Sequence, residues 1–143
     1  MAAMTPAGKL VRAFGDVAAM RALYAPDVEW SLSGSLPFPR PMVGRDAVTA
    51  FNTEVWTVHY RPDCTVEILD EVGDERSSAV RFIYRAHSKL RDAAYENEYT
   101  VFVRSGPAGI THVFEALDTA IILDFLQGRP KGTSFAFLAG DGA

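Results

Sequence analysis

Two glutamates lie in runs of residues that alternate as β-strands do. Glu98 belongs to the run 95–104 and Glu115 to the run that begins at residue 110. Successive residues of a strand point to opposite faces, so each carboxylate lies either on the buried face or on the solvent face. On a buried face, loss of hydration raises a carboxyl pKa towards neutral pH, where the group can donate or accept a proton. These residues therefore indicate acid/base chemistry.

Each candidate also has a structural interpretation. A register change of one residue would move Glu98 to the outer face beside an arginine. Glu115 could form an ion pair or face solvent. Trp30 and Tyr84 could simply fill the core, as large aromatic side chains do in most proteins. The sequence leaves these alternatives open.

The remaining reactive side chains form no known metal or nucleophile motif. His59 follows a predicted helix and could be a base or a histidine at the helix C-terminus. Cys64 is the only cysteine, which rules out an intramolecular disulfide and a thiolate zinc site within one chain. No His-Glu-x-x-His pattern and no acidic calcium loop occurs, so we expect no metal and no cofactor.

Composition narrows the class of partner. The chain has 143 residues, a length typical of one domain, and its 14 basic residues are scattered among 18 acidic ones, for a net charge of −4. A nucleic-acid partner usually requires a basic stripe, so none is expected. No apolar run is long enough for a signal peptide or a membrane span, and we expect a cytoplasmic protein.

The hydrophobic spacing predicts helices first and strands afterwards. Helical spacing covers residues 10–24, divided at 15–16, and again about 46–60. Strands are expected at 28–32, 65–72, 79–89, 95–104 and 110 to about 125, with a Pro/Gly-rich loop at 33–44. This order indicates an α+β domain over residues 1–126 with an antiparallel sheet, followed by a loose C-terminal tail at 127–143.

Four segments carry a family resemblance: 25–30 (APDVEW), 43–48 (VGRDAV), 95–99 (YENEY) and 109–119 (GITHVFEALDT). In this order they resemble the SnoaL-like and ketosteroid isomerase-like members of the nuclear transport factor 2-like superfamily. The resemblance implies a cone, in which a curved antiparallel sheet packs against N-terminal helices around a pocket for a small hydrophobic molecule. The residues it places against the ligand are Trp30, Leu32, Phe51, Val55, His59, Phe82, Thr100, Phe102, Val113 and Leu117.

Departures from ketosteroid isomerase argue against steroid isomerisation. The resemblance places that enzyme's carboxylate base at Leu32 and its partner acid near Thr100, and neither residue can do that work. We instead predict Glu115 as general acid/base, Tyr84 as hydrogen-bond donor to a developing enolate oxygen, and Glu98 as a group that orients the substrate or shares a proton.

Two function classes follow. The first is a cofactor-free isomerase, cyclase, dehydratase or hydrolase that acts on a hydrophobic substrate. The second is a non-catalytic module that binds a ligand or dimerises, since a fold alone does not decide function. In both, we expect a homodimer through the outer sheet face. The residues predicted on that face are Ile83, Tyr99, Val101, Val103 and Phe114, with Arg81 and Arg85 among them.

Overall fold

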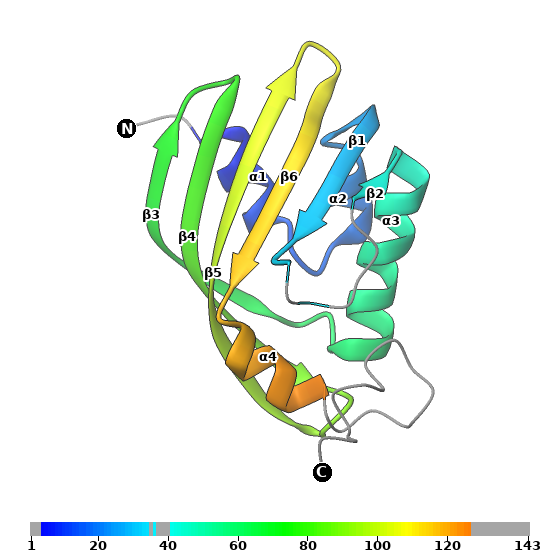
Figure 1. Cartoon of the computed structure of the whole chain (residues 1–143), viewed down its shortest axis with the longest axis vertical. Helices are drawn as coiled ribbons and strands as arrows, with labels where there is room; N and C mark the ends of the chain where they lie inside the picture. Colours follow the sequence, from blue (N-terminus) through cyan, green and yellow to red (C-terminus); the bar gives the residue numbers. More distant parts are fainter. Residues whose placement is uncertain (1–3, 35, 37–40, 127–143) are drawn as a thin grey trace.

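The computed structural model describes residues 4–34, 36 and 41–126, so the predicted tail lies outside the described residues. Its centre is one curved, unclosed six-stranded sheet with the order β2-β1-β6-β5-β4-β3 (Figure 1). Neighbouring strands are antiparallel except β1 and β6, which are parallel. The strands are β1 Tyr24–Leu32, β2 Met42–Val43, β3 Thr65–Gly73, β4 Ser77–Ser88, β5 Ala93–Gly106 and β6 Gly109–Leu117.

Helices cover one face and one end of the sheet. Helices α1 (Pro6–Arg12), α2 (Val17–Arg21) and α3 (Arg45–Glu54) lie on the concave face, and α4 (Thr119–Leu126) follows β6 at one end (Figure 1). Helix α3 continues directly as a π-helical turn, η1 (Val55–His59). The α+β prediction is confirmed. No helix in the described ranges has both the length and the apolarity to cross a membrane.

The predicted division of the first helical segment is confirmed. Gly15 has a φ of 93°, a backbone conformation that favours glycine, and it separates α1 from α2. The carboxylate of Asp16 then accepts a hydrogen bond from the Ala19 N–H at 3.1 Å and caps α2.

The prediction for the end of the chain is partly wrong. The strand predicted from residue 110 to about 125 ends at Leu117, and α4 begins two residues later. Asp118 accepts a hydrogen bond from the Ala120 N–H at 3.1 Å, the bond expected of a residue that starts a helix. The apolar run that follows fits a buried strand or a buried helix equally well, and the Asp-Thr pair decides between them.

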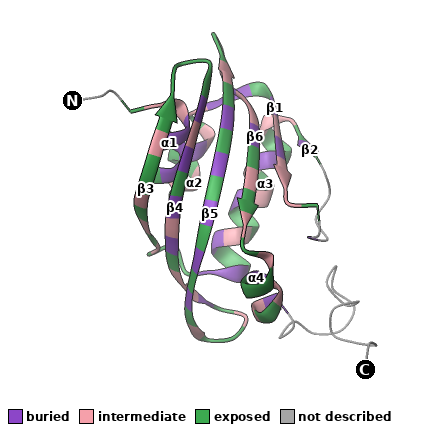
Figure 2. Ribbon diagram, turned by 60° about the vertical axis from the view of Figure 1, so that its left-hand side comes forward, coloured by how far each residue is buried: buried purple, intermediate pink, exposed green. Residues whose placement is uncertain are grey.

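The face assigned to β5 is wrong by one residue. Exposed and buried residues alternate along this strand (Figure 2), and Glu98, Thr100 and Phe102 all point outward. Directly opposite residues of an antiparallel pair share a face, and Tyr99 is paired with the buried Phe82. The inward residues are therefore Tyr95, Asn97, Tyr99, Val101 and Val103.

Ion pairs cover much of the outer face. Arg81 and Arg85 point outward, as predicted, and each guanidinium bridges two carboxylates. Glu98 lies 3.1 Å from the guanidinium of Arg81 and is half exposed. The structure thus bears out the alternative interpretation of Glu98 and removes it from the predicted catalytic set.

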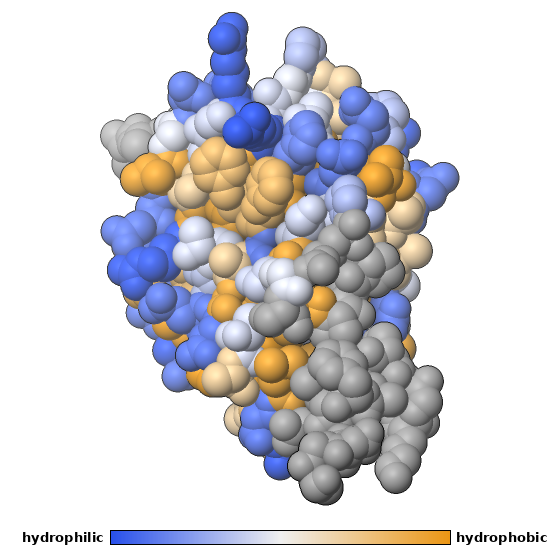
Figure 3. Space-filling model, viewed as in Figure 1, coloured by the Kyte–Doolittle hydropathy of each residue, from blue (hydrophilic) through white to orange (hydrophobic). Residues whose placement is uncertain are grey.

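The apolar part of the outer face differs from the prediction. Tyr99, Val101 and Val103 are buried in the core, so they cannot form an outer contact. An exposed apolar row instead crosses the sheet through Val72, Phe102 and Phe114 (Figure 3), aligned by strand register.

The carboxylate of Glu71 links α1 to β3, the strand at one edge of the sheet. Glu71 accepts hydrogen bonds from the Thr5 N–H and Oγ1 at 2.9 and 2.7 Å, and its second oxygen lies 2.9 Å from the Arg12 guanidinium. The Arg12 hydrogen bond, with those of Thr5, lowers the pKa of Glu71 to about 2, although partial burial opposes this.

The Glu71 contacts should make stability depend on acid pH. Because the folded pKa is below the unfolded one, the stabilisation is complete above about pH 4.5 and is lost as the pH falls towards 2. Glu71→Gln should lower the free energy of unfolding by about 1–2 kcal/mol at pH 7 and have little effect at pH 2. Urea unfolding at both pH values measures this, with Glu75→Gln in the exposed turn as the control. Equal losses at both pH values would contradict it.

Candidate functional site

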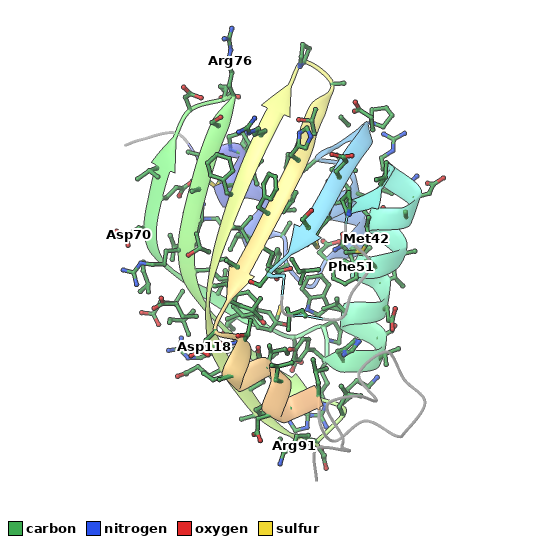
Figure 4. All side chains as sticks on the ribbon, in the orientation of Figure 1. Met42, Phe51, Asp70, Arg76, Arg91 and Asp118 are labelled. Carbon is green, nitrogen blue, oxygen red and sulfur yellow. The ribbon has the colours of Figure 1, made fainter. Side chains whose placement is uncertain are left out.

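A cavity of about 60 Å³ lies between the concave face of the sheet and helices α3, η1 and α4. Figure 4 shows Phe51 on the side of α3 that faces the sheet. Seven of the sixteen described lining residues are Phe, Trp or Tyr, so aromatic side chains make up almost half of the lining. The lining residues are Phe14, Trp30, Leu32, Leu36, Phe51, Asn52, Val55, Trp56, His59, Tyr60, Tyr84, Tyr99, Glu115, Leu117, Ile122 and Leu126.

Six of the ten predicted ligand residues line this cavity. They are Trp30, Leu32, Phe51, Val55, His59 and Leu117. Phe82 and Val113 are inward but belong to the core beneath the cavity wall. Thr100 and Phe102 were predicted wrongly, because they lie on the outward face of β5.

Glu115 is the only acidic residue among the described lining residues. It lies on β6, opposite Val101 of β5 and Leu32 of β1, and its carboxylate accepts a hydrogen bond from Trp30 Nε1 at 3.1 Å. Burial raises the pKa of Glu115 to about 7, and the Trp30 hydrogen bond lowers it only partly. At neutral pH the group can therefore both accept and donate a proton.

Trp30 holds that hydrogen bond in a fixed direction. Its ring is almost completely buried and packs edge-on against Tyr24, with 6.4 Å between ring centroids, and against Phe51 at 6.0 Å. The indole N–H has little freedom to turn away, so the carboxylate of Glu115 is held in one orientation.

Tyr84 lies on the cavity wall, but part of its hydrogen-bonding capacity is used. Its hydroxyl oxygen accepts a hydrogen bond from Trp56 Nε1 at 2.9 Å. Burial raises the pKa of Tyr84 well above its ordinary value, so it remains a protonated phenol. A phenol that accepts from an indole keeps its own O–H for donation.

Sequence analysis missed a second phenol, Tyr99. Its hydroxyl lies 2.8 Å from the Tyr95 hydroxyl, which accepts a hydrogen bond from Asn97 Nδ2 at 2.8 Å. Asn97 also donates to the Asp118 backbone oxygen at 3.0 Å, which anchors the chain where β6 meets α4. The spacing of these three residues could have identified Tyr99. They occur at every second position of β5, as residues on one face of a strand do.

His59 ends the π-helical turn and lines the cavity, with Nε2 3.8 Å from the Glu54 carboxylate. A π-helical turn within a helix often occurs at functional sites. Here α3 and η1 present one continuous stripe to the cavity. It consists of Phe51, Asn52, Val55, Trp56 and His59, and Tyr60, the next residue after the turn, extends it.

Residues 10–113 match the family model of the SnoaL-like domain. The chain belongs to the SnoaL-like domain family. Glu115 lies two residues beyond the matched span, on the same strand as its end. No curated protein matches the sequence.

Solved structures show the same fold for this SnoaL-like domain. A nuclear transport factor 2-like protein of Burkholderia pseudomallei K96243 has 19% identity and a TM-score of 0.69, over 82% of this chain and 91% of that one. PrhC of Penicillium brasilianum NBRC 6234 has 22% identity and a TM-score of 0.66, over 83% and 84%. A protein with a ketosteroid isomerase-like fold from Catenulispora acidiphila DSM 44928, solved in complex with trimethylamine, has 14% identity and a TM-score of 0.67, over 81% and 87%.

Proposed function

We propose that this SnoaL-like domain is a cofactor-free acid/base enzyme for a small hydrophobic substrate, with Glu115 as the residue that takes and returns the proton. The observation that carries this proposal is the partly buried carboxylate of Glu115 on the cavity wall, where loss of hydration raises its pKa to about 7. The fold includes cofactor-free isomerases and cyclases, which is consistent with such chemistry.

The simplest reaction is a proton shift beside a carbonyl group. The Glu115 carboxylate removes a proton from the carbon next to the carbonyl, and the electron pair moves into an enolate. A phenol of Tyr84 or Tyr99 donates a hydrogen bond to the enolate oxygen, where negative charge develops. In a substrate with a β,γ double bond the product of this step is a dienolate, and Glu115 then returns the proton to its γ-carbon, which moves the double bond into conjugation with the carbonyl group and regenerates the carboxylate.

Hydrogen–deuterium exchange tests this proposal before the natural substrate is known. Small enolisable ketones incubated with the protein in D₂O should exchange their α-protons, detected by proton NMR. Glu115→Gln should slow the exchange by about 10²–10⁴-fold, the usual contribution of a positioned acid/base group. Glu98→Gln is the matched control, because that glutamate is on the outer face and should leave the rate unchanged. Equal rates for wild type and Glu115→Gln would refute the role of Glu115.

A second candidate is a ligand-binding module without catalysis. It is favoured by the Catenulispora neighbour, which has this fold and was solved with a small amine. Under this alternative the protein binds small molecules in the cavity. None of the small ketones tested would then exchange its α-protons faster with the protein than in buffer alone.

The proposed oligomer is a homodimer through the outer sheet face. Its support is the exposed row of Val72, Phe102 and Phe114, with exposed fractions of 63%, 37% and 46%. Wild type should sediment as a dimer at micromolar concentration, and Phe102→Glu should sediment as a monomer. Thr100→Glu, on the same face but outside the row, is the control. A wild-type monomer at 100 µM, a concentration on the order of those used for weak dimers, would contradict the proposal.

A further inference from the structure

Seven aromatic side chains line the cavity, and several of their rings contact one another. Phe14 and Trp56 lie with their ring centroids 5.3 Å apart, and Tyr84 lies 5.3 Å from Tyr60 and 5.6 Å from Tyr99. The face of an aromatic ring carries negative potential and attracts a cation within about 6 Å of its centroid. A cation that enters this cavity therefore meets aromatic rings from several directions.

Among the described lining residues, Glu115 carries a negative charge, and none is a Lys or an Arg. Carboxylates in protein interiors are normally paired with a cation, whereas the partly buried carboxylate of Glu115 accepts a hydrogen bond from a neutral indole. His59 is the one described lining residue that can become cationic, and its Nε2 lies 3.8 Å from Glu54 on its own helix.

We infer that the cavity binds a small organic cation, an alkylammonium group held against the aromatic faces with the Glu115 carboxylate as its counterion. This inference rests on the proposed small-molecule pocket and specifies the class of ligand. The cavity of about 60 Å³ limits the cationic group to a few heavy atoms. The indole N–H of Trp56 is already engaged with Tyr84, and the Tyr99 hydroxyl lies 2.8 Å from that of Tyr95.

A pair of isosteric ligands tests the inference. Choline carries a trimethylammonium group, and 3,3-dimethyl-1-butanol has the same shape without charge. Binding is measured by calorimetry and by the fluorescence of Trp30 and Trp56, which both line the cavity, at pH 8.5 and constant ionic strength. We expect choline to bind at least about tenfold more tightly than the neutral isostere, as one cation–π contact and one ion pair would provide.

Glu115→Gln should reduce this preference to near unity, whereas Glu98→Gln on the outer face should keep it. Wild type that binds both ligands equally would overturn the inference and leave the hydrophobic pocket intact. Choline binding that is unchanged in Glu115→Gln would overturn the role of the carboxylate as counterion. The ketone exchange experiment is independent of these outcomes, so failure of the cation inference is distinguishable from failure of the proposed catalysis.

The pH dependence of choline binding gives a second measurement. Affinity should rise with pH as Glu115 ionises and level off once ionisation is complete. The other titratable groups near Glu115 are the phenols of Tyr24, Tyr95 and Tyr99, whose raised pKa values keep them neutral, and His59 with its neighbour Glu54. Loss of charge on His59 would also favour a cation. A rise that persists in Glu115→Gln therefore assigns the effect to His59 and contradicts the inference.

Discussion

Glu115→Gln is expected to stabilise the protein at alkaline pH by about 3 kcal/mol. The folded-state pKa of about 7 exceeds the ordinary value of 4.5 because the carboxylate is buried. The unfolded state therefore releases its proton first, and the wild type loses stability as the pH rises from 4.5 to 7. Above pH 7 the loss is complete. Glutamine does not ionise, and its side-chain oxygen can still accept the Trp30 hydrogen bond.

Urea unfolding at pH 4 and pH 8.5 measures this effect. The two proteins should have nearly the same free energy of unfolding at pH 4, and the variant should be the more stable one at pH 8.5. Glu98→Gln, which loses a surface ion pair with Arg81, should show no such gain. A variant less stable than wild type at pH 8.5 would show that the carboxylate is stabilised by its surroundings rather than strained by them.

Gly109→Ala is expected to destabilise the protein by about 2–4 kcal/mol. Gly109 has a φ of 123°, which disfavours any residue with a Cβ atom. An added Cβ would also lie 2.6 Å from the backbone oxygen of Leu23 and 3.0 Å from the Ala25 nitrogen. Alanine would therefore push β6 away from β1, the parallel pair that sets Leu32 opposite Glu115.

Gly106→Ala in the same turn is the matched control. Its Cβ would meet only the Thr111 side chain, at an ordinary 3.9 Å. Chemical denaturation should show a change of less than about 0.5 kcal/mol for this variant. Similar losses for the two alanines would mean that the turn as a whole, rather than the close approach of β6 to β1, is sensitive.

Most of the order of elements, apart from β2 and α4, could be predicted because its signals are local. Gly15 and Asp16 separate two helices, and alternating residues mark the strands. The β1–β6 pair is parallel and joins residues more than 80 positions apart in the chain, and no local pattern indicates such a contact. The π-helical turn at Val55–His59 lies inside a segment whose spacing predicts one continuous helix, so the change of helix type had no local signal either.

The inner face was predicted correctly for β6 and wrongly for β5. On β6, Glu115 lies two positions after the buried Val113, and residues two apart on a strand share a face, so Glu115 was expected to point inward. On β5, the family resemblance favoured an inward Glu98, although the alternation of Tyr95 and Tyr99 with glutamates indicates the opposite face. The alternation of apolar and charged residues along β5 predicts its inner face correctly. It also identifies Tyr99, the phenol that the predicted site lacked.

The proposed chemistry and the expected effect of Glu115→Gln on stability both depend on the pKa of Glu115. Carbon-13 NMR of the glutamate side-chain carboxyls, titrated from pH 3 to pH 9 and assigned with Glu115→Gln, measures it directly. We expect the Glu115 resonance to titrate near pH 7, well separated from the surface glutamates. A Glu115 midpoint near 4.5 would contradict the assignment of this residue as the general acid/base.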